Sequence, residues 1–238
     1  MEKTFLIADS ETTVNGHVAD AGFVLTNRKG KIITSCGVLV REFYLDRENN
    51  PLFHDQSADP LWGKRNLPRR YAEYDAMLND GRRMLASVAA VNRWLSQVNA
   101  KYRPTITAYN WAFDKDKFNK SGIDLEQFQN SFCLWHAAAH KYAQTKAYRQ
   151  FILENVAFNT PTKHGNMSYH TNAEVMAKFV LGNPELPNEP HTALEDARDY
   201  ELPILVDILK KSRRKADYME APPYNWRNYQ VKDWFTAK

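Results

Sequence analysis

Two acidic residues separated by one position, Asp9 and Glu11, stand at the end of an apolar run, residues 5–8. If this run is a β-strand, alternate side chains point to opposite faces, so both carboxylates project from one face and Ser10 from the other. The run shows no polar alternation, which is typical of a strand buried on both faces. A buried strand that ends in paired carboxylates is a natural place for a divalent cation, because Mg²⁺ and Mn²⁺ prefer hard oxygen ligands.

Two later segments of the chain contain further acidic residues, and one of them also contains a histidine. Asp114 follows a short β-branched and aromatic run, at the point where a strand is expected to turn into a helix. His191 stands just outside a second expected helix, which Thr192 and Glu195 would begin with a capping box, and Asp196 lies near its first turn. Open α/β sheets bind their ligands at the carboxyl ends of the strands, where the first two carboxylates also lie.

Four carboxylates, Asp9, Glu11, Asp114 and Asp196, would therefore meet at one edge of the sheet. Like charges a few ångströms apart oppose one another's ionisation, so the cluster needs cations. Two divalent ions about 4 Å apart can bridge a phosphate, activate the attacking water and stabilise the departing oxygen. Histidine has an unperturbed pKa near 6.5 and is suited to accept the proton of that water, which is the role we expect for His191. The reaction predicted is phosphodiester hydrolysis.

The supporting elements are predicted from periodicity and turn residues. The first three strands should pair as antiparallel hairpins, and a helical crossover beginning at Met84 should return the chain to a strand parallel to the first. A helix closed by Gly182 should precede the last motif, and Pro203 should kink the helix that follows it. The expected strands are residues 4–13, 21–26, 32–43, 105–109 and 131–135, and the expected helices begin near residues 84, 114, 136, 172 and 192.

Residues 45–74 change character, since prolines interrupt them and aromatic residues alternate with basic ones. Two interpretations stay open for this segment. It is either a loop that grips nucleic acid, with Trp62 among the contacting residues, or an ordinary surface excursion packed on the domain.

Taken together, the motifs resemble those of a known family. Asp9-Ser-Glu11-Thr-Thr13, Asn110-Trp-Ala-Phe-Asp114 and His191-Thr-Ala-Leu-Glu-Asp196-Ala-Arg resemble the three exonuclease motifs of the DEDDh family, the DnaQ-like 3′–5′ exonucleases. The third motif has a histidine five residues before its aspartate, and in this respect it resembles the histidine subclass of the family. The resemblance implies an α/β, ribonuclease H-like fold: a mixed five-stranded sheet flanked by helices, with a long insertion after the third strand. It implies an exonuclease domain over residues 1–210, the insertion at 45–74, and a basic, aromatic C-terminal extension at 211–238.

The resemblance also implies roles for single residues. Asp9, Glu11, Asp114 and Asp196 would bind two Mg²⁺ or Mn²⁺ ions, and His191 would be the general base. Thr12 would contact the 3′-terminal nucleotide through its backbone.

The expected substrate is the 3′ end of single-stranded nucleic acid, with DNA favoured, and the products are nucleoside monophosphates. Trp62, Trp111 and Phe113 could stack on the terminal bases, although Trp111 and Phe113 are equally well explained as core residues. Two alternatives stay open: an exoribonuclease acting on RNA 3′ ends or short oligoribonucleotides, and a proofreading or partner-binding subunit of a polymerase complex. A homodimer is also open.

Composition sets the remaining limits. The 238 residues are 43% hydrophobic and 25% charged, with a formal net charge of +4 that is compatible with a polyanionic partner. No apolar run approaches the roughly 20 residues of a membrane helix, so a cytoplasmic protein without membrane contact is expected. Cys36 and Cys133 suggest reduced thiols rather than a disulfide framework. A zinc site with Cys133, His136 and His140 is disfavoured, because no fourth ligand follows at a usual spacing.

Overall fold

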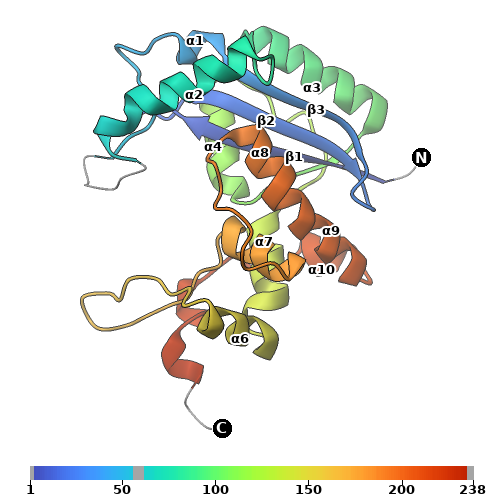
Figure 1. Cartoon of the computed structure of the whole chain (residues 1–238). Coiled ribbons are helices and arrows are strands. Elements are labelled where there is room, and N and C mark those ends of the chain that lie inside the picture. Colours follow the sequence, from blue (N-terminus) through green and yellow to red (C-terminus); the bar gives the residue numbers. More distant parts are fainter. Residues whose placement is uncertain (1–2, 56–61, 235–238) are drawn as a thin grey trace.

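The computed structural model describes residues 3–55 and 62–234 and is built around one six-stranded sheet. The strand order is β4-β3-β2-β1-β5-β6, so that the strand carrying the first two carboxylates lies in the interior of the sheet (Figure 1). The strands are β1 Thr4–Thr12, β2 Val18–Asn27, β3 Ile32–Val40, β4 Met84–Ala86, β5 Thr105–Ala108 and β6 Ser131–Cys133.

The pairing directions agree with the expected ribonuclease H-like fold. Strand β2 runs antiparallel to both β1 and β3, whereas β5 is parallel to β1 and β6 is parallel to β5. The expected number of strands was wrong, because β4 adds a sixth strand parallel to β3 at the edge of the sheet. Its three residues are too few to show a period of two, so the sequence pattern from Met84 onward predicts only the helix that follows. That helix instead begins after Ser87, whose Oγ accepts a hydrogen bond from the Ala90 N–H at 3.2 Å.

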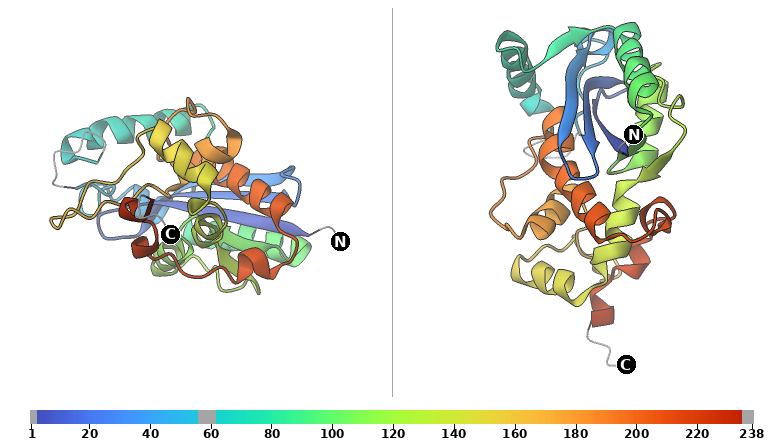
Figure 2. Two further views of the ribbon diagram at one scale, coloured as in Figure 1. Left: turned by 90° about the horizontal axis from the view of Figure 1, so that it is seen from below. Right: turned by 90° about the vertical axis from the view of Figure 1, so that its right-hand side faces the viewer.

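Helices cover both faces of the sheet, as Figures 1 and 2 show. In β1, Leu6 and Ala8 face the layer formed by α3 and α4, while Phe5 and Ile7 face the layer that contains α5, α7 and α9. The alternation of a strand thus determines that Asp9 and Glu11 lie on the α9 side. The helices of these layers are α3 Val88–Tyr102, α4 Trp111–Lys120, α5 Leu134–Ala138, α6 Lys146–Glu154, α7 Ala173–Leu181, α8 Ala193–Glu195 and α9 Leu202–Lys211.

The segment after β3 is more regular than its prolines suggest. It contains α1 Arg41–Tyr44 and α2 Leu67–Asn79, and Pro68 lies in the first turn of α2, where a missing N–H costs little. Tyr44, Tyr74 and Met77 pack in a separate apolar cluster beside β2 and β3. The interpretation of 45–74 as an irregular loop was therefore wrong for its second half, while residues 56–61 lie outside the described residues.

The chain widens into π-helical geometry just before α9, over Asp196–Glu201. Pro203 follows in the first turn of α9. A widened turn thus lies on the N-terminal side of Pro203, which cannot donate the α-helical hydrogen bond at that point. The kink expected at Pro203 stays a prediction.

The C-terminal segment packs on the rest of the domain through its aromatic side chains. Tyr218 in α10, Ala216–Met219, is buried against Phe5, and the Tyr224 ring stacks on Trp135 with the centroids 4.2 Å apart. Residues 235–238 lie outside the described residues, and the division at residue 210 stays a prediction.

Within the described ranges no helix is both long and apolar enough to cross a membrane, and the cytoplasmic location stays a prediction.

Candidate active site

The five residues expected to carry out the chemistry line one cavity of about 550 Å³ at the carboxyl ends of β1 and β5. Thr12, Trp62 and Phe113 also line it, whereas Trp111 packs against the apolar cluster beneath α3 and α4. Trp111 is partly buried there, which favours the interpretation as a packing residue, and a contact with the substrate stays a prediction. The catalytic candidates that line the cavity are Asp9, Glu11, Asp114, His191 and Asp196.

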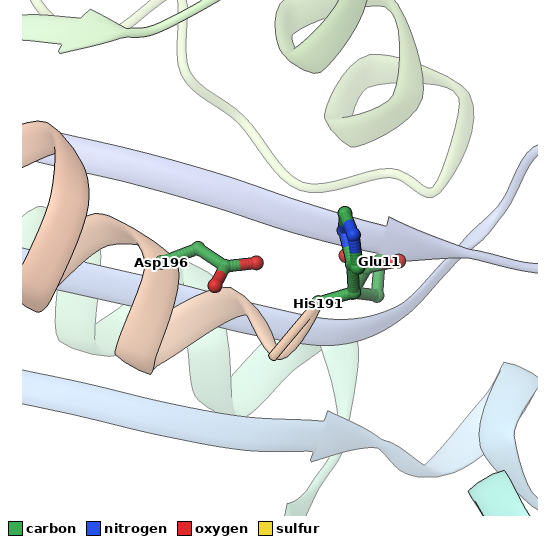
Figure 3. Close-up of side chains that lie close together, drawn as sticks. All are labelled: Glu11, His191 and Asp196. Atoms are coloured by element: carbon green, nitrogen blue, oxygen red, sulfur yellow. The ribbon is translucent and has the colours of Figure 1, made fainter. Parts of the chain in front are cut away.

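Glu11, His191 and Asp196 come closest together. One ligand atom from each lies within 4.8 Å of the others, although they come from β1 and from the chain around α8 (Figure 3). The Asp196 carboxylate points toward the other two side chains, and its Oδ1 atom is buried without a hydrogen-bond partner among the described residues. Two carboxylates and an imidazole at this separation, with an unsatisfied buried oxygen, fit a divalent cation.

Asp114 reaches the same cavity from the opposite face of the sheet. It lies in the first turn of α4 and accepts a hydrogen bond of 2.7 Å from Ser10 Oγ, which points away from Asp9 and Glu11 as the alternation predicts. Asp9 lies on the α9 side of the sheet, and the charges of both Asp114 and Asp196 act on it. Neither Asp9 nor Asp114 belongs to the closest group, but both line the cavity that the group occupies.

Burial raises the pKa of every carboxyl in this cluster, and the charges of neighbouring carboxylates raise it further for Asp9, Glu11 and Asp196. Burial is the first cause in each case, and it raises the pKa of Glu11 to about 8, of Asp114 to about 7 and of Asp196 to about 9. The pKa of Asp9 is also well above its ordinary value, because burial is reinforced by the charge of Asp114. The cluster therefore resists ionisation unless positive charge enters it.

A buried ion-pair network fixes the segment that carries His191 and Asp196. Arg83 is fully buried and pairs with Asp20 at 2.8 Å and with Glu195 at 2.5 Å. Asp20 also accepts a hydrogen bond of 2.9 Å from the Ala193 N–H. The expected capping box is thus not formed at the backbone: Thr192 makes no side-chain capping hydrogen bond, and the Glu195 carboxylate is used by Arg83.

Glycine allows the same segment to lie directly on the sheet. A Cβ atom at Gly22 of β2 would be 2.2 Å from the carbonyl carbon of Ala193, a distance that no side chain can occupy. The close approach brings α8 onto β2, one strand away from Glu11. His191 at the start of this segment has a positive φ of 55°, a sparsely populated conformation for a non-glycine residue that is common at functional sites.

Arg70 of α2 packs behind Glu11 and Trp62, two residues that line the cavity. It is buried, donates a hydrogen bond of 2.6 Å to the Phe53 carbonyl, and lies 3.9 Å from a Glu11 oxygen. Its guanidinium stacks 4.6 Å from the centre of the Trp62 ring, and the Trp62 ring meets His191 edge-on at 4.9 Å. This basic residue of the insertion is therefore turned inward and supports the residues of the cavity wall, and a role of residues 45–74 in gripping nucleic acid stays a prediction.

The mouth of the cavity carries exposed aromatic rings. Phe53 and Phe113 line it and are 43% and 46% exposed, and Lys117 lies 5.0 Å over the Phe113 ring. The Thr12 carbonyl already accepts a hydrogen bond of 2.8 Å from the Phe53 N–H, which ties the insertion to the end of β1.

The solved structures similar to this chain include two exonucleases. Exonuclease X, solved in complex with 5′-overhanging duplex DNA, is 16% identical over 90% of this chain and 96% of its own, with a TM-score of 0.40. Exonuclease I, solved with the inhibitor BCBP, is 13% identical over 91% of this chain and 43% of its own, with a TM-score of 0.49. No protein-family model and no curated protein sequence matches. Because both TM-scores lie below 0.5, function has to be inferred from this chain's own residues.

Several residues of the site were not predicted from the sequence. Arg83 and Arg70 look like ordinary surface cations in a polar stretch, and only their burial reveals their roles. Glu189 and Glu201 line the cavity as additional carboxylates, and burial together with the charge of Glu174 raises the pKa of Glu189 to about 7. Strand alternation could have identified Ser10, because it assigns that side chain to the face where α4 packs.

The raised carboxyl pKa values predict an unusual pH dependence for the metal-free protein. The folded state keeps protons on Glu11, Asp114 and Asp196 that the unfolded chain, with carboxyl pKa values near 4, releases. Stability in EDTA should therefore fall as the pH rises from about 4 to about 9. We expect the melting temperature in EDTA to drop by several degrees across this range, and Mg²⁺ to restore it at the alkaline end. A melting temperature that is constant from about pH 5 to about pH 8 would show that these groups titrate normally.

Proposed function

We propose that this protein is a divalent-cation-dependent 3′–5′ exonuclease that hydrolyses single-stranded nucleic acid, DNA in preference, to nucleoside monophosphates. The observation that carries the proposal is the close group of Glu11, His191 and Asp196 in a cavity that Asp9 and Asp114 also line. Carboxylates that repel one another, with an unsatisfied buried oxygen among them, suit phosphoryl chemistry with cations better than acid–base chemistry alone.

The four aspartate and glutamate side chains are the proposed holders of two Mg²⁺ or Mn²⁺ ions. When bound, such ions lower the pKa of a coordinated water and neutralise charge on the scissile phosphate. Ser10 keeps the Asp114 carboxylate oriented toward the cavity, and Arg83 and Asp20 fix the segment from which Asp196 projects. The residues assigned to the ions are Asp9, Glu11, Asp114 and Asp196.

His191 is the proposed general base. Its imidazole lies within 4.8 Å of the Glu11 and Asp196 ligand atoms, so it is beside the place where an attacking water would be held. The Trp62 ring packs against it edge-on, which limits the positions that the imidazole can take. A base with a pKa near neutrality is suited to accept the proton of the attacking water.

The shape and lining of the cavity favour attack at a chain end. Its volume of about 550 Å³ is in the range of pockets that enclose one small ligand, as a terminal nucleotide would be. The exposed rings of Phe53 and Phe113 can stack on bases near the end of the strand, and Lys117 can contact a backbone phosphate. Thr12, at the end of β1, is proposed to contact the terminal nucleotide through its backbone.

Degradation of 5′-labelled single-stranded DNA and RNA tests this function directly. We expect a ladder that shortens from the 3′ end in Mg²⁺ or Mn²⁺, no cleavage in EDTA, and a loss of about 100-fold or more in the variant His191→Ala. Faster degradation of RNA would establish the exoribonuclease alternative. Internal cleavage, or full activity in EDTA, would contradict the proposal.

A further inference from the structure

Glu201 is a buried carboxylate for which the proposed chemistry has so far no role. It is 2% exposed, lines the same cavity as Asp9 and Asp114, and ends the π-helical segment Asp196–Glu201. Its Oε2 atom is buried and has no hydrogen-bond partner within the described part of the chain. The carboxylate also receives a hydrogen bond from the backbone of Tyr109 at the end of β5. It is therefore held at one point, with one oxygen still unsatisfied.

The π-helical geometry explains why Glu201 reaches the cavity. In an α-helix of 3.6 residues per turn, a residue five positions after Asp196 would stand about 140° away around the axis. In a π-helix the hydrogen bonds join residues five apart, so Glu201 follows Asp196 on nearly the same side. Pro203 reduces the cost of this widening, because it cannot donate the α-helical hydrogen bond to the carbonyl of Asp199. Single π-helical turns of this kind are frequent at functional sites.

Glu201 adds a further negative charge to a cavity that already contains several carboxylates. The charges of Asp114, Glu189 and Asp196 all act on Glu201, and Glu201 in turn acts on Asp9. The ion pairs of the described residues include no arginine or lysine partner for Glu201, in contrast to Glu195, which pairs with Arg83. An unsatisfied carboxylate among other carboxylates is costly unless a cation binds beside it.

We propose that Glu201 is a fifth carboxylate of the divalent-cation centre, facing it from the side of Asp9 and Asp114. This inference depends on the part of the proposed function that places divalent cations in the cavity. It does not depend on which nucleic acid the protein cleaves. The additional negative charge would strengthen cation binding before any nucleic acid arrives. It would also make the metal-free fold less stable than the same fold without the charge.

Binding of Mn²⁺ in the absence of nucleic acid tests the role of Glu201. The variant Glu201→Gln keeps the side-chain length and an oxygen that can accept the Tyr109 hydrogen bond, but it removes the charge. We expect Mn²⁺ affinity, measured by calorimetry and by the electron paramagnetic resonance signal of free Mn²⁺, to fall by about 10- to 100-fold. We also expect the melting temperature in EDTA to rise and the increase produced by Mn²⁺ to shrink.

Asp199→Asn is the matched control, because Asp199 is an exposed carboxylate on the same segment, paired with Arg198. It should leave Mn²⁺ affinity unchanged.

If Glu201→Gln does not fold, Glu201→Met removes the same charge with an apolar chain of similar length. Wild-type Mn²⁺ affinity in a folded Glu201 variant would overturn the inference, even if the protein degrades DNA from the 3′ end. Weaker Mn²⁺ binding in a protein without nuclease activity would support it and overturn the proposed function instead.

Discussion

Replacement of Asp196 by asparagine is expected to reduce nucleotide release at saturating Mg²⁺ by about a thousandfold or more, which corresponds to about 4 kcal/mol of transition-state stabilisation. Asp196 belongs to the closest group of ligand atoms, and its Oδ1 atom is satisfied by no described residue. An amide keeps the shape of the side chain but loses the charge and one ligand oxygen. Single-turnover degradation of a 5′-labelled strand measures the loss without interference from product release.

The same variant should be more stable than the wild type when metal is absent. Burial raises the pKa of Asp196 to about 9, so folding opposes the ionisation that this carboxyl prefers in the unfolded chain at neutral pH. A higher melting temperature in EDTA together with lost activity would show that Asp196 is retained for its chemistry. Activity within tenfold of the wild type would contradict its assignment as a cation ligand.

Replacement of Arg83 by methionine is expected to destabilise the protein by about 3–5 kcal/mol, because it leaves buried carboxylates without their partner. Arg83 and Asp20 are both fully buried, and Arg83 also pairs with Glu195, next to Asp196. The loss should therefore also loosen the segment that carries His191 and lower activity at temperatures where the protein is still folded. Urea unfolding measures the first effect, and activity at low temperature measures the second.

Arg82→Met is the matched control for this experiment. Arg82 is the preceding residue, is largely exposed and pairs with the exposed Asp80. Surface pairs contribute about 0–1 kcal/mol, so this variant should unfold close to the wild type. A similar small effect in Arg83→Met would show that the buried network does not fix the segment.

Local patterns predicted the central part of the fold because they depend on neighbouring residues. The apolar run of β1 and the asparagine–glycine and glycine turns after it define hairpins over a few residues, and the structure contains these strands. Sequence patterns failed to predict an element that is very short and a helix whose first turn contains a proline. β4 has only three residues, and α2 carries Pro68 in its first turn, a residue type that is also common in loops.

The sequence by itself determined which residues are candidates for the proposed chemistry, since strand alternation places Asp9 and Glu11 on one face and the expected strand end places Asp114 near them. The structure brings all five predicted catalytic residues to one cavity, although their roles stay predictions. What sequence spacing could not show was Glu201, because α-helical periodicity turns it away from Asp196.

Only the tertiary structure decided how the site is held. Ser10 meets Asp114 across 104 positions, and Arg83 meets Glu195 across 112. Arg70 is buried against Glu11 and Trp62 although it lies in a polar, basic stretch. Each of these contacts depends on burial away from water, and the Arg83–Glu195 pair also depends on the close approach that Gly22 allows between β2 and Ala193. Neither property is encoded in the spacing of neighbouring residues.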